Sequence, residues 1–518
     1  MTWQPEIDEL ARRHSLKEEM GGPEGVDRQH SHGKLTIRER IDLLADPGTF
    51  DEMGKLQGRT VYNDAGELES FSPVSRVRGL AKVNGRRVHV SGQDFTIRGG
   101  TARTDDGGVD IGHGHPDANQ LRLPNINLLD GAGGSVQEFD DLGRTYIPDG
   151  DFSNYCNLLS ISPVVTAVLG PAAGGSAPIP PLSHFSVMAK GTGQVFPGGP
   201  PVVKAALNLD IDKDVLGGSE IHTKISGVVD NIAEDEADAI SQVKQFLSYL
   251  PDNVWEMPPR IESTDDPNRR DERLLSLIPR DKRKPYNPRV IIEGVLDEGS
   301  FFEIAPDYGS SRIIGLARAD GYPVGVMANN PNRRGGSMDS DAAEKSARLV
   351  QLCDTFHIPM VVLMDDPGFM VGPESEMNGI ERSGARLLYS IVQSKMPWIS
   401  FICRQSFGLA GSLQFRPGPH MFRRYAWVSG HWGSMHIEGG TSAAFRRVIE
   451  AADDPEAKRL EIENSFQRIA SPFRTAEASG LDLIDPRDTR AIMCDFVDMA
   501  QGVIKTQLGP GIGPTYRP

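Results

Sequence analysis

Short apolar runs alternate with amphipathic stretches along this chain. Residues 339–356 begin with an Asp suited to cap a helix and place apolar side chains at helical spacing, at Ala343, Ala347, Val350 and Cys353. Runs with the length of buried strands are Val290–Val295, Val324–Ala328, Met360–Met364 and Ile399–Cys403. A charged helix is expected at Asp454–Phe473, followed by a turn and a second helix. This alternation predicts an α/β fold with helices packed on the sheet.

The chain also repeats itself. Segments 43–54, 84–94, 99–100, 127–133 and 163–176 resemble, in the same order, segments 294–305, 320–330, 335–336, 362–368 and 397–410. The offset between the paired segments decreases only from 251 (43 to 294) to 234 (163 to 397). Such self-similarity predicts two homologous halves, residues 1–250 and 289–518, joined by a polar, Pro-rich linker at 251–288.

Charge and composition limit the possible partners. The 518 residues carry a formal net charge of −16, which argues against a large nucleic-acid or anionic-membrane surface but leaves room for a local basic patch. Phe152–Ala189 lacks Asp, Glu, Lys and Arg, but its prolines and glycines would break a spanning helix, so a buried, turn-rich core is expected there. The four cysteines form no CxxC, and the N-terminus shows no apolar signal segment. We therefore expect a soluble, cytoplasmic protein without disulfides.

Two glycine turns are the strongest candidates for chemistry. Gly174-Gly175-Ser176 and Gly408-Leu409-Ala410 each follow an apolar strand, and they correspond to one another in the repeat. A strand-to-helix turn of this kind exposes backbone N–H groups that can stabilise an enolate or another oxyanion. Small residues also allow close packing of a helix on a strand, which is the alternative for a single turn. Two copies in register favour a pair of oxyanion holes.

Other polar groups give weaker signals. The segment HGHPD at 113–117 with Asp110, and the segment HWGSMHIE at 431–438, hold possible metal ligands, but a solvated loop and packing, respectively, are favoured, so no metal is predicted. The basic groups at 283–284 and 332–334 could meet phosphates, with an ordinary solvated loop at least as favoured. Neither a GxSxG elbow nor a P-loop occurs.

Longer motifs then identify a family. HGKLTIRERIDLLADPGTFDEMG, SGQDFTIRGG, DGAGGSVQE, GPAAGGS, VLGGSEIHTKISGV and MDDPGFMVGPESEMNGIERSGARLLYS occur in this order, and ASPFRTAEASGLDLIDPRDTR follows them. Together they resemble the carboxyltransferase (β) subunits of biotin-dependent acyl-CoA carboxylases, of the propionyl-CoA and methylcrotonyl-CoA type. The resemblance covers roughly residues 28 to 495.

The resemblance implies a fold, an assembly and a reaction. The fold would be two crotonase-like β-β-α domains, in a homo-oligomer that is usually a hexamer built from dimers. The reaction would move a carboxyl group from carboxybiotin, carried by a separate subunit, to the α-carbon or vinylogous γ-carbon of an acyl-CoA. No Met-Lys-Met biotin attachment site and no ATP-binding segment occur in this chain. A biotin carboxylase and a biotin carrier would therefore be its partners.

The resemblance also implies site residues. The acyl-CoA thioester would lie near the amides of Gly174 and Gly175, and carboxybiotin near those of Leu409 and Ala410. Substrate contacts are expected at Gly133, Gly134, Ser135, Ser176 and Gly408. Both anions need preorganised donors, and neither step needs a side-chain nucleophile.

Several residues depart from the family pattern near both turns. Leu409 replaces a glycine, Ser135 replaces an arginine, and Val428 follows Ala-Trp where a proline is usual. Residues 431–440 replace small apolar residues with His, Trp and Met, and DDGGVDIGHGHPDANQL replaces a helix that normally bears lysine. Alternatives to carboxyl transfer are therefore a biotin-independent decarboxylase or carbon–carbon hydrolase acting on a β-keto or carboxylated acyl-CoA, and a non-catalytic scaffold subunit.

Overall fold

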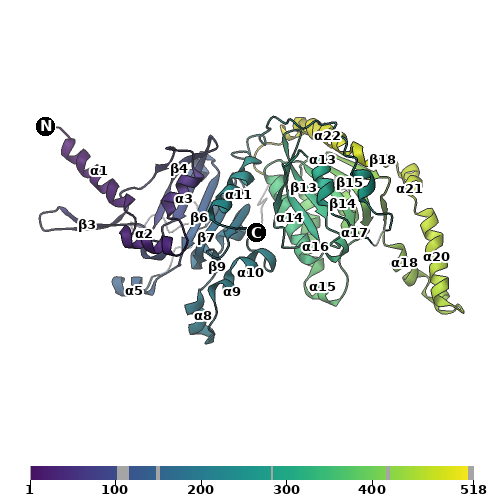
Figure 1. The fold of residues 1–518 in the computed structure, drawn as a ribbon, viewed down its shortest axis with the longest axis horizontal. Coiled ribbons are helices and arrows are strands. Elements are labelled where there is room, and N and C mark those ends of the chain that lie inside the picture. The colour runs from purple at the N-terminus through teal and green to yellow at the C-terminus, as the bar shows by residue number, and fades with distance from the viewer. Residues whose placement is uncertain (1, 102–115, 147–151, 282–283, 416–419, 512–518) are drawn as a thin grey trace. The chain divides into compact units, whose positions relative to one another are not determined.

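The computed structural model describes residues 2–101, 116–146, 152–281, 284–415 and 420–511 (Figure 1). The chain divides into two compact units: residues 1–256 with 510–518 form unit 1, and residues 257–509 form unit 2. The polar segment that follows the first half belongs to unit 2 from Met257 onward, where Leu274 packs into the core.

Unit 1 is built on an eight-stranded sheet with the order β1-β4-β5-β6-β7-β8-β10, and β9 pairs with the far end of β7. The pairs β1–β4 and β4–β5 are antiparallel, and the remaining pairs are parallel. The strands are β1 (Asp51–Glu52), β4 (Arg76–Val83), β5 (Arg86–Gln93), β6 (Asn125–Gly131), β7 (Val164–Ala173), β8 (Phe185–Ala189), β9 (Gln194–Phe196) and β10 (Asn231–Ala233). A separate hairpin consists of β2 (Gly58–Tyr62) and β3 (Leu68–Pro73).

Helices complete unit 1. They are α1 (Gln4–Glu18), α2 (Gly22–Ser31), α3 (Ile37–Leu44), α4 (Pro116–Leu121), α5 (Val136–Leu142), α6 (Ser153–Leu158), α7 (Ile179–Leu182), α8 (Pro200–Leu207), α9 (Lys213–Gly217), α10 (Ser219–Lys224) and α11 (Glu236–Ser248), with 3₁₀ turns η1 (Arg98–Gly100) and η2 (Gly174–Ser176). The Asp235 side chain caps α11 by accepting from the Asp238 amide, and Ile240, Val243 and Leu247 bury one face of this helix. That face lies against β7 and β8, beside α3 (Figure 1).

Unit 2 repeats this sheet strand for strand. Its order is β11-β12-β13-β14-β15-β16-β18, with β17 on β15, and its parallel and antiparallel pairs match those of unit 1. The strands are β11 (Phe302–Ile304), β12 (Arg312–Ala319), β13 (Tyr322–Asn329), β14 (Met360–Asp366), β15 (Trp398–Phe407), β16 (Phe422–Trp427), β17 (His431–Gly433) and β18 (Asp482–Ile484). The predicted α/β fold of two homologous crotonase-like domains is confirmed by this topology and by the structural comparison described below.

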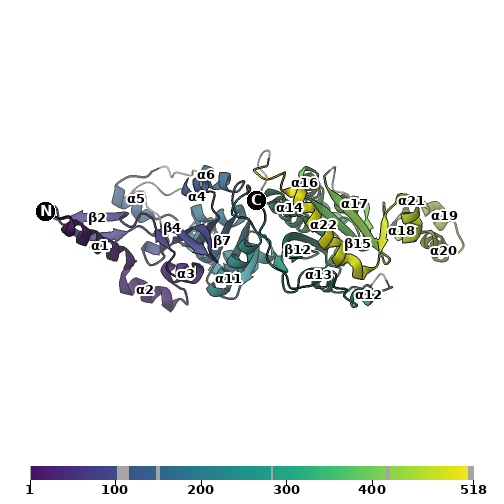
Figure 2. The ribbon, with the colours of Figure 1, turned by 90° about the horizontal axis from the view of Figure 1, so that it is seen from above.

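The helices of unit 2 are α12 (Leu274–Leu277), α13 (Arg289–Val295), α14 (Ser340–Thr355), α15 (Pro373–Met377), α16 (Ile380–Gln393), α17 (Gly408–Phe415), α18 (Ile437–Ala444), α19 (Arg446–Glu450), α20 (Pro455–Ile469), α21 (Pro472–Ser479) and α22 (Thr489–Ile504), with 3₁₀ turns η3 (Arg334–Gly336) and η4 (Pro486–Asp488). Several of these helices, among them α14, α16 and α22, lie along the sheet of unit 2, whereas α18–α21 extend beyond one edge of it (Figure 2). The predicted helix at 339–356 is confirmed as α14, with the Asp339 side chain accepting from the Ala342 amide. The charged helix expected at 454–473 ends earlier than predicted, at Ile469.

The strand predicted at Val290–Val295 is wrong, because this run forms helix α13. Pro288 stands just before the helix, where its fixed φ suits a helix start. Ile291, Ile292 and Val295 are buried in the core of unit 2. A short apolar run that is buried all round does not by itself distinguish a helix from a strand.

Matching turns in the two units support the duplication. In unit 1, both carboxylate oxygens of Asp46 accept the amides of Asn84 and Gly85, at 2.9 and 2.7 Å. In unit 2, Asp297 accepts the amides of residues 320 and 321, at 3.0 and 2.7 Å. The four residues whose amides donate these hydrogen bonds all have positive φ. The same tight hairpin turn therefore occurs in each unit. The pairing of segments 43–54 and 294–305 inferred from sequence therefore corresponds to a real structural equivalence.

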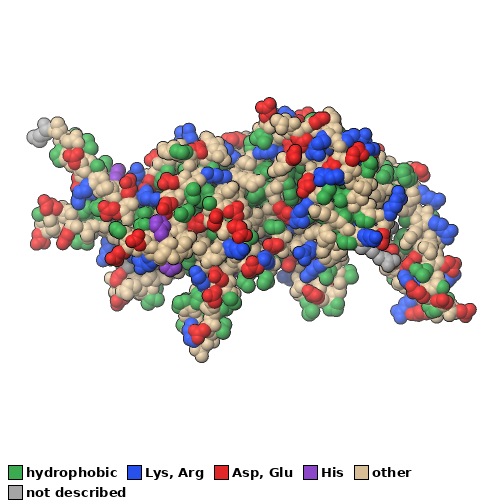
Figure 3. Space-filling view, in the orientation of Figure 1, with side chains coloured by type: hydrophobic (Ala, Val, Ile, Leu, Met, Phe, Trp, Pro, Cys, Tyr) green, Lys and Arg blue, Asp and Glu red, His purple; other side chains and the backbone are tan. Residues whose placement is uncertain are grey.

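Charges of both signs are interspersed on the face of each unit shown in Figure 3. Within the described part of the chain, no helix combines the length and apolarity needed to cross a bilayer.

Candidate functional site

A left-handed glycine follows the central strand of each sheet. In unit 1, β7 ends at Ala173, and Gly174 has φ 60°. In unit 2, β15 ends at Phe407, and Gly408 has φ 62°. We call Gly174–Ser176 the N-turn and Gly408–Ala410 the C-turn. Ala173 pairs with the last residue of β9 and Phe407 with the last residue of β17, so the two turns are equivalent in register.

Backbone conformation, and not crowding, explains why glycine begins each turn. A Cβ added at Gly174 would have only the Gly133 Cα within 4 Å, at 3.9 Å. A Cβ at Gly408 would have only the Ser434 carbonyl oxygen, at 3.8 Å. The space is open, but a left-handed φ is costly for any residue with a side chain. The chain therefore turns sharply at both glycines and begins a helical segment whose first amides have no acceptor within the helix.

Leu409 is accommodated without loss of its amide. The φ of Leu409 is not positive, and the residue is 58% exposed. The following Ala410 is fully buried at the start of α17. The isobutyl group thus projects outward from unit 2, and the N–H groups of Leu409 and Ala410 stay at the start of a helix, where the helix dipole favours an anion.

The loop after β6 lies against the N-turn. Gly133 has φ 89°, and a Cβ there would lie 3.2 Å from the Ala173 carbonyl oxygen. Gly134 has open space around it. The buried Ser176 hydroxyl accepts from the Gln93 side chain at 3.2 Å, and the oxygen of that same amide accepts from the Asp130 backbone. The structure thus brings Gly133, Gly174 and Ser176 together around the end of β7.

Ser135 has a different role in this structure. Its hydroxyl accepts the Gln137 amide at 3.2 Å and so caps α5. This contact fixes the start of α5 directly after the glycine loop. The Ser135 hydroxyl is therefore engaged in capping its own helix.

Sequence reasoning missed a buried carboxylate in the strand beside each turn-bearing strand. Asp130, at the end of β6, accepts from Lys34 at 2.8 Å, from Arg40 at 2.9 Å and from Gln29 at 2.9 Å. Burial lowers the pKa of Lys34, and the Asp130 charge opposes that shift. Arg40 also forms a buried pair with Glu236 on α11, at 2.6 Å. This network connects the N-turn region to the outer helices of unit 1.

Asp365 occupies the equivalent place in unit 2. Its carboxylate accepts from Arg404 at 2.9 Å and from Gln405 at 3.0 Å, both on β15. The Tyr286 ring faces the Arg404 guanidinium at 5.1 Å, and burial, with the nearby Asp365 charge, raises the pKa of Tyr286 well above its usual value. The sequence signal was the acidic residue in both DGAG and MDDPG, at the carboxyl end of a buried strand.

The residues considered above as weaker metal and phosphate candidates have other environments where the structure describes them. His431 and His436 both pack on the Phe407 ring, at centroid distances of 5.6 and 4.0 Å. No group of three or more potential metal ligands occurs among the described residues. The candidate loop at residues 110–115 falls in a stretch that the structure does not describe. Arg334 pairs with Asp339 at 3.1 Å.

Comparisons with known proteins agree with this geometry. A family model described as carboxyl transferase domain matches residues 28–503. The propionyl-CoA carboxylase carboxyltransferase subunit of Haloferax mediterranei is 34% identical over 98% of each chain. The methylmalonyl-CoA decarboxylase α subunit of Veillonella parvula is 32% identical over 96% of each chain.

A solved structure is similar over nearly its whole length. It is the transcarboxylase 12S hexamer, with methylmalonyl-coenzyme A and methylmalonic acid bound, and it superposes with a TM-score of 0.86. The sequences are 32% identical, and the match covers 99% of this chain and 98% of the other.

Proposed function

Because this chain belongs to the carboxyl transferase family, we propose that it transfers a carboxyl group between biotin on a partner protein and the carbon next to the thioester of an acyl-CoA. The observation that carries the proposal is the duplicated turn: two equivalent left-handed glycines, each followed by helix-start amides. Two donor sites suit a reaction that passes through two anions, one on each reactant.

The two turns would divide the work. The amides of the N-turn, at Gly174 and Gly175, would hold the thioester oxygen and stabilise it as the α-proton leaves. The amides of Leu409 and Ala410 in the C-turn would hold the ureido oxygen of biotin. Carboxybiotin, when bound, would supply both the CO₂ and the base. Gly133, Gly134, Ser135, Ser176 and Gly408 would shape the pockets beside these donors.

Structure favours backbone donors for this chemistry. Gly174 and Gly175 are exposed at the end of a strand that is buried at every position except Pro171, so a ligand can reach their amides while the strand fixes their direction. Removing one preorganised oxyanion donor typically costs about 100- to 1,000-fold in rate. By internal register, Gly175 and Ser176 correspond to Leu409 and Ala410, so the Ser176 amide is a further N-turn donor candidate.

A biotinylated partner and self-assembly belong to the same proposal. The related transcarboxylase 12S structure is described as a hexamer and as the core of a multienzyme. We extend both features to this chain: a homohexamer that receives biotin on a separate carrier subunit. Native mass spectrometry of the purified full chain tests the hexamer, and co-purification with a biotinylated protein on avidin tests the partner.

A decarboxylase is the second candidate. The relative from Veillonella parvula carries that name, and Leu409 changes the surface of the C-turn. In this alternative, the N-turn would stabilise the same thioester enolate after loss of CO₂ from a carboxylated acyl-CoA, and a proton would then be added to the α-carbon. No biotin would be needed for such a reaction.

One experiment separates the two. The purified chain is incubated with a panel of acyl-CoAs and carboxyacyl-CoAs, with and without a biotin-carboxylase and biotin-carrier fraction, ATP and bicarbonate, and products are read by mass spectrometry. A carboxylate gained only in the complete mixture supports transfer. Loss of CO₂ by the chain alone supports the decarboxylase.

A paired variant ties either activity to the N-turn. Gly175→Val should lower turnover at least about 100-fold, because the side chain would obstruct the amide donor. Gly502→Val is the control, since Gly502 lies on α22 with no neighbouring atom within 4 Å of an added Cβ. Full activity of Gly175→Val would contradict the oxyanion assignment.

A further inference from the structure

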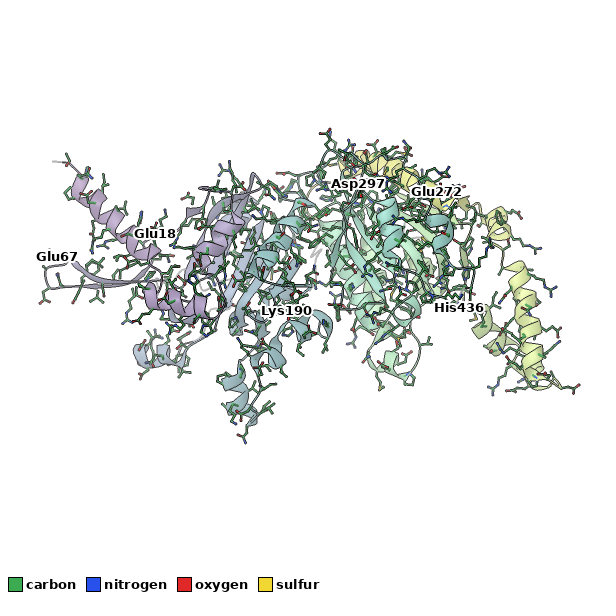
Figure 4. The ribbon with its side chains drawn as sticks, in the orientation of Figure 1. Glu18, Glu67, Lys190, Glu272, Asp297 and His436 are labelled. Atoms are coloured by element: carbon green, nitrogen blue, oxygen red, sulfur yellow. The ribbon has the colours of Figure 1, made fainter. Side chains whose placement is uncertain are left out.

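His436 lies directly before α18 in unit 2 (Figure 4). It contacts two other segments. Its ring centroid is 4.0 Å from that of Phe407, with the two planes tilted by 31°. Its Nε2 is 3.0 Å from the Pro367 carbonyl oxygen. A carbonyl can only accept, so Nε2 carries the proton and donates.

These contacts join three segments that meet at the C-turn. Phe407 is the residue just before Gly408 and ends β15. Pro367 precedes Gly368, whose added Cβ would lie 3.7 Å from the Phe407 carbonyl oxygen. Ser434 lies in the loop that leads to His436. Its carbonyl oxygen is the atom that a Cβ added at Gly408 would approach, at 3.8 Å. The C-turn is therefore flanked by both loops, and His436 bonds one loop to the other while packing on the strand end.

Unit 1 provides an internal comparison without this contact. Ala173 pairs with Phe196, and Phe407 pairs with Gly433, so the chain positions equivalent to Phe407 and His436 are Ala173 and Gly199. Gly199 precedes α8 just as His436 precedes α18, in a similar extended conformation. An alanine and a glycine stand where the C-terminal half has an aromatic ring and an imidazole. The contact is thus an addition specific to one of two otherwise matching sites.

We propose that His436 is a positioning residue of the C-turn: it fixes Phe407 and Gly408, and through them the direction of the Leu409 and Ala410 amides. This inference rests on the proposed function for its catalytic consequence. A turn held on both sides keeps its amides aimed at one point, and small errors in such positioning are costly to rate. The N-turn lies against the Gly133 loop much as the C-turn lies against the loop of Gly368, but residues 173 and 199 provide no ring pair there.

Substitutions at His436 test the proposal. His436→Gly recreates the residue of unit 1 and should lower kcat for biotin-dependent transfer about 10- to 100-fold. The KM for acyl-CoA should not change. His436→Gln retains a planar amide donor for the Pro367 carbonyl, and it should recover most of the lost rate. His32→Ala is the matched control, because His32 also bonds a backbone carbonyl, that of Arg28 at 2.7 Å, but at an exposed position directly after α2.

A second measurement does not depend on turnover. Hydrogen exchange followed by mass spectrometry should show faster exchange of the amides in 405–412 in His436→Gly, and wild-type protection in His32→Ala. Unchanged exchange, or faster exchange with unchanged kcat, would overturn the positioning role. If the wild-type chain transfers no carboxyl group to any acyl-CoA, the proposed function fails, and the exchange result alone decides whether His436 holds the turn.

Discussion

At the scale of single residues, Leu409 shows how a departure from a family pattern can leave the backbone conformation of a turn intact. The left-handed residue of the C-turn is Gly408, so the next position tolerates a side chain. That side chain points outward and is 58% exposed. A sequence pattern registers the lost glycine but not which of the two glycines the turn requires.

Leu409→Gly is therefore expected to lower stability by no more than about 1 kcal/mol, because the removed side chain is exposed and the cost is that of a glycine in the first turn of α17. Because the proposed function places biotin at the C-turn, the effect of this substitution should appear in the KM for the biotinylated carrier and not in the KM for acyl-CoA. Steady-state kinetics with each substrate varied in turn measure this. A fall in carrier KM would identify Leu409 as a steric restriction, and a changed acyl-CoA KM would contradict its placement.

Lys345 gives a pH dependence with a definite sign. Its Nζ donates to the carbonyls of Ala305, Tyr308 and Arg312, at 2.6, 2.8 and 2.9 Å. Burial lowers its pKa from 10.5 to about 7. Between these pH values the unfolded chain binds more protons than the folded one at this site. Raising the pH across this window therefore stabilises the folded state.

The expected slope from this group is about 1.4 kcal/mol per pH unit between pH 7 and 10. Denaturant unfolding of wild type and Lys345→Met at several pH values isolates it, because all other titrating groups are shared. The difference in free energy of unfolding should grow in favour of wild type as pH rises. A difference that is constant with pH would show that Lys345 keeps its charge throughout the range.

At the scale of elements, the two units neutralise an equivalent buried carboxylate with cations from different places in the fold. Asp130 and Asp365 are equivalent buried carboxylates, and the strand position facing them is Gly170 in β7 and Arg404 in β15. Arg404 neutralises Asp365 from within the sheet. In unit 1, the glycine leaves room, and the cations come from Lys34 and Arg40.

Gly170→Ala should destabilise unit 1 by about 3 kcal/mol, because the added Cβ would lie 1.9 Å from the Asp130 Oδ1 and disturb a buried ion network. Thermal unfolding and denaturant titration measure the loss. Gly134→Ala is the control, since nothing lies within 4 Å of its added Cβ. Equal stability of the two variants would show that Asp130 can move without cost.

The same scale shows where sequence patterns succeed and fail. The buried strands at 324–328, 360–364 and 399–403 were predictable because long-range packing only reinforces a strong local preference. The helix at 289–295 was not, since its apolar run fits both structures. The His436–Pro367 bond joins residues 69 positions apart, and no local pattern reports such a contact. Repetition was the exception, because it compares distant segments directly.

At the scale of the whole molecule, duplication produces two equivalent turns that have since acquired different surroundings. The N-turn lies against a glycine loop, and the C-turn lies between loops joined by His436. If each turn serves one reactant, damage to one should be visible in the kinetics of that reactant alone. The equivalence of Gly174 and Gly408 offers a matched pair of substitutions to test this, since both have φ near 60° and open space around the Cβ position.

Gly174→Ala and Gly408→Ala each force a side chain into left-handed backbone, a strain of about 1 to 2 kcal/mol. The turn can relieve this strain only by moving its amides. We expect Gly174→Ala to raise the KM for acyl-CoA and Gly408→Ala to raise the KM for the biotinylated carrier, each with a lower kcat. The KM for acyl-CoA and the KM for the carrier are measured for both variants. If each turn binds one reactant, the large increase in KM falls on a different substrate in each variant. If both variants raise the same KM, both turns act on the same reactant, and the assignment of one reactant to each half is wrong.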